Sequence, residues 1–312
     1  MSVLRSALLW ASQNQQLESV VRSSRAMRPL VSRFMPGETI DDALAASRAL
    51  QAAGTPVIIT YLGENVTSDT AADDTLAEYH RLVTALGPMR DGAHVSIKLT
   101  QFGWDLNKGR ALDRVKILSR LVAANESTLA IDMESSPYLE STIDAYAELA
   151  RGARHVALCL QAYMHRTPAD VERLVGVQPY IRLVKGAYRE HGSVALQSRV
   201  AIDARYREIG RTLLRASGQG VRVAFGTHDV PLVERLREDA RELGVADTAY
   251  EIQMLYGIQD AGRRRLAAAG LRTRVLISYG KAWYAWFMRR LAEKPSNLML
   301  VSRNLLSRGA VQ

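Results

Sequence analysis

Cysteine is nearly absent from this sequence, since Cys159 is the only one among 312 residues. A disulfide within the chain and a metal site built from several thiolates are therefore excluded, and a reducing compartment is expected. The six histidines show neither the H-x-x-x-H nor the H-E-x-x-H spacing of zinc sites. The sequence thus predicts no metal site.

Long apolar runs and nucleophile motifs are also missing. No stretch approaches the run of about 18 apolar residues that crosses a membrane, and Leu8-Leu9-Trp10-Ala11 is too short for the core of a signal peptide. Neither a G-x-S-x-G turn nor a Walker loop is present. Aromatic residues make up only 6% and do not alternate with basic ones, which argues against a groove for single-stranded nucleic acid.

What is present is the composition of an ordinary globular protein, with 47% hydrophobic and 23% charged residues. The net charge of +9 favours anionic partners. Only six of the 41 basic residues are lysines, however, and codon bias alone can enrich arginine, so the charge carries little functional weight. The densest basic cluster, Arg263-Arg264-Arg265, precedes an alanine run and predicts the solvated face of a helix.

Eight short runs rich in apolar and β-branched residues recur along the chain, and helical periodicity occupies the intervals between them. The runs cover residues 57–61, 95–99, 129–132, 156–160, 181–184, 221–225, 250–254 and 275–278. Helices are predicted over residues 39–53, 73–86, 138–149, from 167 onward, and over 234–243. Strands that alternate with helices predict an α/β fold with a parallel sheet, most simply a closed (β/α)8 TIM barrel with extra N-terminal helices.

The alternative is an open, doubly wound sheet, but that fold would want a G-x-G-x-x-G fingerprint in the first strand–helix turn, and the chain has none there. We therefore divide the chain into a helical leader over residues 1–38, a barrel over 39–294 and a tail over 295–312. Pro36-Gly37 and Pro295 mark the two boundaries.

Seven of the eight predicted strands end in a charged or hydrogen-bonding residue. These residues are Glu64, Lys98, Asp132, Gln161, Lys185 with Tyr188, Thr227 with His228, and Gln253. Taken singly, each could cap a helix or satisfy nearby backbone groups. In a barrel, however, the carboxyl ends of the strands meet at one face, so together these residues predict a polar pocket. Lys98 and Asp132 follow adjacent strands at matching depth, and an ion pair between them is expected.

An arginine pair stands out in the last predicted helix. Arg289 and Arg290 follow an aromatic stretch over residues 284–287, which suits a bidentate grip on a small carboxylate shielded from water. The alternative is that both side chains extend to solvent over an apolar face. Because the predicted site has cations and a carboxylate but neither a metal nor a nucleophile, an organic cofactor is expected.

Several of these segments resemble the proline dehydrogenase family. They read Y-L-G-E at 61–64, S-I-K-L at 96–99, I-D at 131–132, L-Q-A-Y at 160–163, R-L-V-K-G-A-Y at 182–188, G-T-H at 226–228, E-I-Q-M-L at 251–255 and R-R-L-A-E at 289–293. The resemblance covers about residues 35 to 300. R-L-V-K-G-A-Y and the terminal R-R-x-x-E are specific in combination.

The resemblance implies a flavoprotein with a distorted (β/α)8 barrel. Such an enzyme uses FAD to oxidise L-proline to Δ1-pyrroline-5-carboxylate, the first step of proline catabolism, and passes the electrons to a membrane quinone. The long aldehyde dehydrogenase part of bifunctional relatives is lacking, so a monofunctional bacterial type is implied, with a separate pyrroline-5-carboxylate dehydrogenase downstream. A cytoplasmic location with peripheral contact at the inner face of the membrane is expected, and no nucleic acid partner.

The resemblance also implies roles for individual residues. Lys98, Arg289 and Arg290 would hold the proline carboxylate, while Glu64 would pair with Arg289 and gate the site. Asp132, beside Lys98, and Tyr188 would be the catalytic residues near the substrate. Arg182 would approach the flavin N5, with Gln161 beside the isoalloxazine. The remaining contacts to FAD would come from Met133, Lys185, Gly186, Ala187, Tyr188, Gly226, Thr227, His228 and Gln253.

One position departs from the family pattern. Family members often place a tyrosine on the last strand where this chain has Leu276, and nearby Tyr279 would point elsewhere in a regular strand. A second enzymatic hypothesis is therefore oxidation of a related cyclic amino acid such as hydroxyproline. A third, from another class, is a catalytically inactive barrel whose arginine-rich faces bind nucleic acid or lipid.

Overall fold

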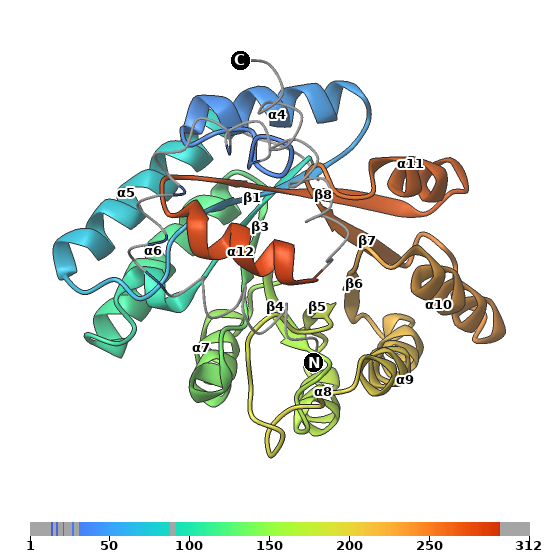
Figure 1. Ribbon diagram of the computed structural model, residues 1–312. Coiled ribbons are helices and arrows are strands. Elements are labelled where there is room, and N and C mark those ends of the chain that lie inside the picture. Colours follow the sequence, from blue (N-terminus) through green and yellow to red (C-terminus); the bar gives the residue numbers. More distant parts are fainter. Residues whose placement is uncertain are drawn as a thin grey trace.

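The predicted closed barrel is present. The computed structural model describes residues 14, 17, 21, 27, 31–87 and 92–293, and its eight parallel strands pair in sequence order, with β8 returning to β1 (Figure 1). The strands are β1 (Val57–Tyr61), β2 (Ala93–Ile97), β3 (Thr128–Ile131), β4 (Val156–Gln161), β5 (Tyr180–Val184), β6 (Arg222–Gly226), β7 (Tyr250–Leu255) and β8 (Arg272–Tyr279). The alternative of an open doubly wound sheet is therefore wrong.

Helices surround the barrel on its outside (Figure 1). They are α4 (Ile40–Ala52), α5 (Asp69–Leu86), α6 (Lys108–Ala124), α7 (Leu139–Leu149), α8 (Thr167–Val175), α9 (Arg199–Ser217), α10 (Val230–Glu242), α11 (Asp260–Ala268) and α12 (Trp283–Glu293), with two short 3-10 turns, η1 (Leu99–Phe102) and η2 (Ser136–Tyr138). Of the proposed divisions, most of the leader and the whole of the tail lie outside the described residues. Within the described part of the chain, no helix is both long and apolar enough to span a membrane.

Side chains at the starts of the helices explain where several of them begin. Thr39 caps α4 in a capping box with Asp42, as its position before the helix predicts. The helix expected from residue 73 begins earlier, at Asp69, because the Ser68 side chain accepts from the Ala71 amide. Asp229 caps α10 in the same manner, through the Leu232 amide.

The strands turn apolar side chains outward and many polar ones inward. Outward residues such as Ile59, Ile97 and Leu158 join the main core beneath the helices. The interior holds a small apolar cluster of Ala130, Ala157, Tyr180 and Ala224. Buried polar residues share the strands with it: Thr60, His94, Ser96, Gln161, Arg182, Glu251, Gln253, Arg274 and Ser278. Branched apolar side chains usually fill this space, so the polar interior indicates a functional cavity.

Helix α12 lies across the mouth of the barrel, inside the ring that the other helices form (Figure 1). Its aromatic face packs on the segment that precedes α4: the Phe34 and Phe287 rings lie 6.1 Å apart, and the Trp283 indole donates to Glu38 at 2.8 Å. This contact holds the end of α12 that carries Arg289 and Arg290 over the carboxyl ends of the strands.

The three consecutive arginines of α11 do not all face solvent. Arg263 is buried, and its Nη1 donates to Thr55 Oγ1 at 2.9 Å, whereas Arg264 and Arg265 are exposed. Three successive residues cover more than half of a helix circumference, because a turn holds 3.6 residues. The expectation of a wholly solvated cluster is therefore wrong for Arg263.

A buried aspartate between α9 and α10 should make stability depend on pH. Asp239 is fully buried, accepts from Arg207 at 2.6 and 2.8 Å, and also pairs with Arg211. Burial alone would raise the pKa of Asp239, but the two guanidiniums outweigh it and lower the pKa below 3.8.

We predict that Asp239→Asn lowers the free energy of unfolding at pH 7 by about 1.5–3 kcal/mol, the usual contribution of hydrogen bonds to a charged group. The folded pKa lies below the unfolded value, so this stabilisation is present above about pH 3.9 and fades as the pH falls towards the folded pKa. Urea unfolding at neutral and at strongly acidic pH measures the difference. A deficit of equal size at both pH values would contradict the prediction.

Candidate active site

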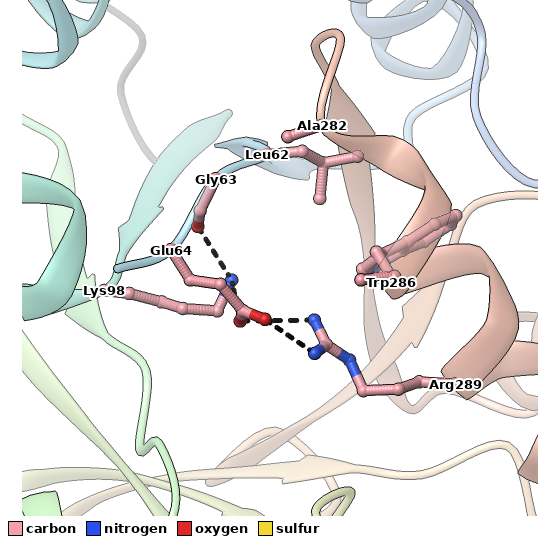
Figure 2. Close-up of a pocket in the computed structure, with 8 residues that line it drawn as sticks. Leu62, Gly63, Glu64, Lys98, Ala282, Trp286 and Arg289 are labelled. Carbon is pink, nitrogen blue, oxygen red and sulfur yellow. Dashed lines mark hydrogen bonds and ion pairs between the residues drawn. The ribbon is translucent and has the colours of Figure 1, made fainter. Parts of the chain in front are cut away.

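A small cavity lies where α12 meets the carboxyl ends of β1 and β2. It measures about 150 Å³ and is lined by Leu62, Gly63, Glu64, Lys98, Ala282, Ala285, Trp286 and Arg289 (Figure 2). That is below the roughly 300–1,000 Å³ of pockets for drug-sized ligands. Charged groups line one side and apolar groups the other, so the cavity suits a small molecule with a carboxylate and an apolar body.

The charged side of the cavity centres on one carboxylate. Arg289 grips Glu64 through Nη1–Oε1 at 2.8 Å and Nη2–Oε2 at 3.3 Å, while Lys98 Nζ lies 3.8 Å from Glu64 Oε2 (Figure 2). Lys98 also donates to the Gly63 carbonyl at 3.4 Å. The contact expected between Glu64 and Arg289 is thus present. The geometry shows how two cations on separate elements hold a carboxylate at this point.

Burial and charge oppose each other at this centre. Burial would raise the pKa of Glu64, but the charges of Lys98 and Arg289 lower the pKa overall. Burial lowers the pKa of Lys98, and Arg289 and Arg290 add to that shift, although Glu64 counteracts them. Glu64 is therefore ionised at neutral pH, and the charge of Lys98 depends on the carboxylate beside it.

The expected ion pair between Lys98 and Asp132 is not formed. Asp132 instead accepts from Ser96 Oγ at 2.6 Å and pairs with the Arg182 guanidinium. Lys98 lies past the end of β2, where the chain turns into η1, and its ammonium reaches Glu64 on the loop after β1. Lys98 and Asp132 do lie at equal depth after neighbouring strands, as expected. Each side chain nevertheless pairs with a different, nearer opposite charge.

Arg182 is the most buried cation of the site. It lies on β5 with Asp132 as its partner, and burial lowers its pKa to about 10. Its Nε and Nη1 atoms are buried and make no hydrogen bond within the described part of the chain. A buried donor without a hydrogen-bond partner costs free energy, so these two atoms indicate a ligand that accepts hydrogen bonds here.

Two glutamines near Arg182 have buried hydrogen-bond acceptors, where Arg182 has buried donors. Strand register puts Gln161, Val184, Gly226 and Gln253 side by side on β4 to β7. The Oε1 atoms of Gln161 and Gln253 are buried, and neither has a hydrogen-bond partner among the residues described. Any side chain at Gly226 would collide with Val184, since an added Cβ would lie 2.8 Å from Cγ1. The interior from β4 to β7 thus offers donors and acceptors to one polar, planar group.

The loop after β5 brings Tyr188 close to Arg289. The Arg289 guanidinium lies 5.6 Å from the centre of the Tyr188 ring, a cation–π arrangement. Burial raises the pKa of Tyr188, which keeps its hydroxyl neutral. Gly186 has φ 121°, and an added Cβ there would lie 2.3 Å from the Tyr163 ring, so only glycine fits.

The other residues expected to bind a cofactor lie at the same end of the barrel. Lys185 pairs with Asp203 at 2.5 Å and Asp229 at 2.8 Å. Thr227 Oγ1 accepts from the Asp229 amide at 3.2 Å, at the start of α10. Met133 is buried, Ala187 and His228 are half-buried, and Arg290 is half-buried beside Arg289. The structure brings the predicted residues to one face of the barrel, but their roles remain predictions.

Sequence reasoning included Trp286 at the site but missed Glu134. Trp286 lines the cavity one helical turn before Arg289, within the aromatic stretch that was expected to shield the carboxylate from water. Glu134 is buried, accepts from Thr100 N and Oγ1 at 3.2 and 2.6 Å, and its carbonyl accepts from Gln161 Nε2 at 2.7 Å. Burial raises the pKa of Glu134. It follows Asp132 by two residues, and only the fold distinguishes it from a helix-capping acid.

Tyr279 on the last strand points away from the barrel interior, as expected for a regular strand. Tyr279 donates to Glu78 on α5 at 3.2 Å, so its hydroxyl lies in the helical layer, away from the barrel interior. Leu276 is half-buried at the inward-facing position three residues earlier. The barrel therefore presents an aliphatic side chain here and no aromatic hydroxyl.

Comparison with known proteins yields one family. The sequence profile described as proline dehydrogenase matches residues 43–303. The chain is 30% identical over 305 residues to proline dehydrogenase 2 of Bacillus subtilis subsp. natto, covering 98% of this chain and 99% of that protein. It is 33% identical over 307 residues to the proline dehydrogenase of Deinococcus radiodurans, covering 97% of each.

A solved structure has the same fold. Proline utilization A from Bdellovibrio bacteriovorus, inactivated by N-propargylglycine, superposes with a TM-score of 0.79 at 23% identity. The match covers 92% of this chain and 38% of that one.

Proposed function

Because this chain belongs to the proline dehydrogenase family, we propose that it oxidises L-proline to Δ1-pyrroline-5-carboxylate with FAD as its cofactor and a membrane quinone as electron acceptor. The observation that carries the proposal is the carboxylate held by Arg289 and Lys98 in the small cavity. A substrate carboxylate that takes the place of Glu64 would gain the same partners, and Glu64 would then act as the gate.

The residues of the interior fit FAD. Arg182 offers two buried donors, and Gln161 and Gln253 offer two buried acceptors, which match the mixed polar edge of an isoalloxazine. Lys185, Thr227 and His228 would contact other parts of FAD, whose anionic phosphates would be favoured by a cation and by the start of α10. When bound, FAD supplies the hydride acceptor, its N5 atom, for the hydrogen at C5 of proline.

The charges around the cavity favour the neutral amine that this transfer needs. With Glu64 displaced as the gate, Lys98, Arg289 and Arg290 would together disfavour an ammonium ion. Asp132, which could attract one, is bonded to Arg182 and Ser96. Arg182, in turn, would stabilise negative charge that develops on the cofactor. The chain would therefore bind the minor, neutral form of proline and orient it through its carboxylate.

A second candidate substrate is hydroxyproline, because Leu276 leaves the interior without an aromatic hydroxyl at that position. Electron transfer to quinone would require peripheral contact with the inner face of the membrane, from the cytoplasm. A separate pyrroline-5-carboxylate dehydrogenase would consume the product. No nucleic acid takes part in this proposal.

The decisive experiment is anaerobic reduction of the purified protein by a panel of cyclic amino acids. We expect flavin absorption bands that bleach fastest with L-proline. Faster bleaching by hydroxyproline would favour the second substrate. A colourless protein that takes up no FAD would reject both and leave a barrel that binds another partner.

We predict that Arg289→Met and Arg290→Met each raise the KM for proline about 10- to 100-fold while FAD stays bound. Each change removes a charge-assisted bond to the carboxylate, worth about 1.5–3 kcal/mol. Steady-state kinetics and the flavin spectrum measure the two effects. Arg264→Met, which removes an exposed arginine from α11, is the matched control. Unchanged KM in both variants would disprove the carboxylate clamp.

We predict that a carboxylate ligand binds more weakly as the pH becomes alkaline. Lys98 loses its charge as the pH rises through its folded pKa, which burial lowers. This loss should therefore occur at a lower pH than for an ordinary lysine, whose pKa is about 10.4. Cyclopentanecarboxylate is a suitable probe because it has no amine to titrate. Its inhibition constant should rise with pH in the wild type, rise later in Lys98→Arg, and stay high and flat in Lys98→Met. A flat wild-type profile would show that Lys98 does not hold the ligand.

A further inference from the structure

A carboxylate and a guanidinium are buried together beneath the proposed cofactor site. Glu251 on β7 is 4% exposed and Arg274 on β8 is 1% exposed. Glu251 Oε1 accepts from Arg274 Nε at 2.9 Å and from Gln253 Nε2 at 2.8 Å. Arg274 Nη1 also donates to the Val57 carbonyl at 3.2 Å. Neither charged residue lines the small cavity at the barrel mouth, so the pair acts on other residues.

The ionised carboxylate determines which way the Gln253 amide faces. A carboxylate only accepts hydrogen bonds, so it attracts the NH2 end of an amide and repels the oxygen. The NH2 group of Gln253 has a second partner in the Tyr180 hydroxyl, at 3.4 Å. The carbonyl oxygen must then face the opposite way, and it is the buried atom left without a partner among the residues described.

We propose that Glu251 is a positioning residue that, through Gln253, presents a hydrogen-bond acceptor to the N3–H group of the flavin. The inference rests on the proposed function. N3–H is the one N–H donor between the two carbonyl oxygens on the edge of an oxidised isoalloxazine. A reversed amide would point NH2 at N–H and lose the bond. Arg274 neutralises Glu251 and thereby lets a carboxylate remain ionised in the interior.

A purely structural role for the pair makes a different prediction. Arg274 and Glu251 join β7 to β8 and, through Val57, to β1, so their loss could weaken the barrel without touching the cofactor. A structural effect would lower stability equally whatever residue stands at position 253. An effect through Gln253 disappears once that side chain is removed, because coupled residues are not additive.

The experiment compares three variants: Gln253→Met, the pair variant Glu251→Met with Arg274→Met, and the triple variant. Changing both charged residues leaves no unpaired buried charge. FAD affinity is measured by titrating apoprotein, and ionisation of flavin N3 by the absorption spectrum of bound FAD against pH. An acceptor at N3–H keeps that proton bound to higher pH, and a merely structural pair would not move this ionisation.

We expect Gln253→Met and the pair variant each to weaken FAD binding about tenfold and to lower the pH at which N3 ionises. The triple variant should match Gln253→Met. Asp239→Asn is the control: it removes a buried charge elsewhere and should lower stability without changing N3 ionisation. If the pair variant does not fold, Glu251→Gln replaces it, since a second amide offers donors as well as an acceptor and no longer imposes one orientation.

Three results would overturn the proposal or its premise. Unchanged N3 ionisation in Gln253→Met would show that Gln253 does not face this group. A shift in Gln253→Met but not in the pair variant would show that Glu251 does not act through it. A wild-type apoprotein that binds no FAD would reject the proposed function itself, and is thereby distinguishable from failure of the positioning role.

Discussion

The structure depends on one constraint: a charge that is largely removed from water, inside the barrel or at its mouth, needs an opposite charge beside it. Three carboxylate–guanidinium pairs meet this need. Glu64 with Arg289 joins the loop after β1 to α12, Asp132 with Arg182 joins β3 to β5, and Glu251 with Arg274 joins β7 to β8. Each pair also ties together parts of the chain that are distant in sequence.

The three pairs differ in which charged or hydrogen-bonding groups they leave available to a ligand. At the mouth, the Glu64 carboxylate pairs with Arg289 and Lys98, two cations that could also bind a substrate carboxylate. Deeper in, Arg182 keeps two donors without partners within the described structure, although Asp132 neutralises its charge. Deepest, Glu251 and Arg274 satisfy one another and act on Gln253. Neutralisation thus permits a polar interior, and the unused hydrogen-bonding atoms specify what the interior can bind.

Local patterns sufficed for much of the fold and for the composition of the site. The apolar runs located all eight strands, but they missed strand ends such as Arg272 and Arg274, because inward polar residues interrupt the apolar pattern. The strand-end ring followed from the rule that parallel strands end at one face, whereas the Glu64–Arg289 contact was implied only by the resemblance to the family. Glu134 was missed, since an acid shortly after a strand has common structural uses.

The sequence by itself determined the period of strands and helices, and which chemical groups collect at the barrel mouth. These are local properties of neighbouring residues. Only the tertiary structure decided which acid meets which base. Asp132 could face Lys98 or Arg182 by strand position alone. The turn into η1 carries Lys98 towards Glu64, while Arg182 approaches Asp132 from a strand 50 residues away. Opposite charges attract without regard to sequence order, so their pairing follows from distances that only the closed barrel sets.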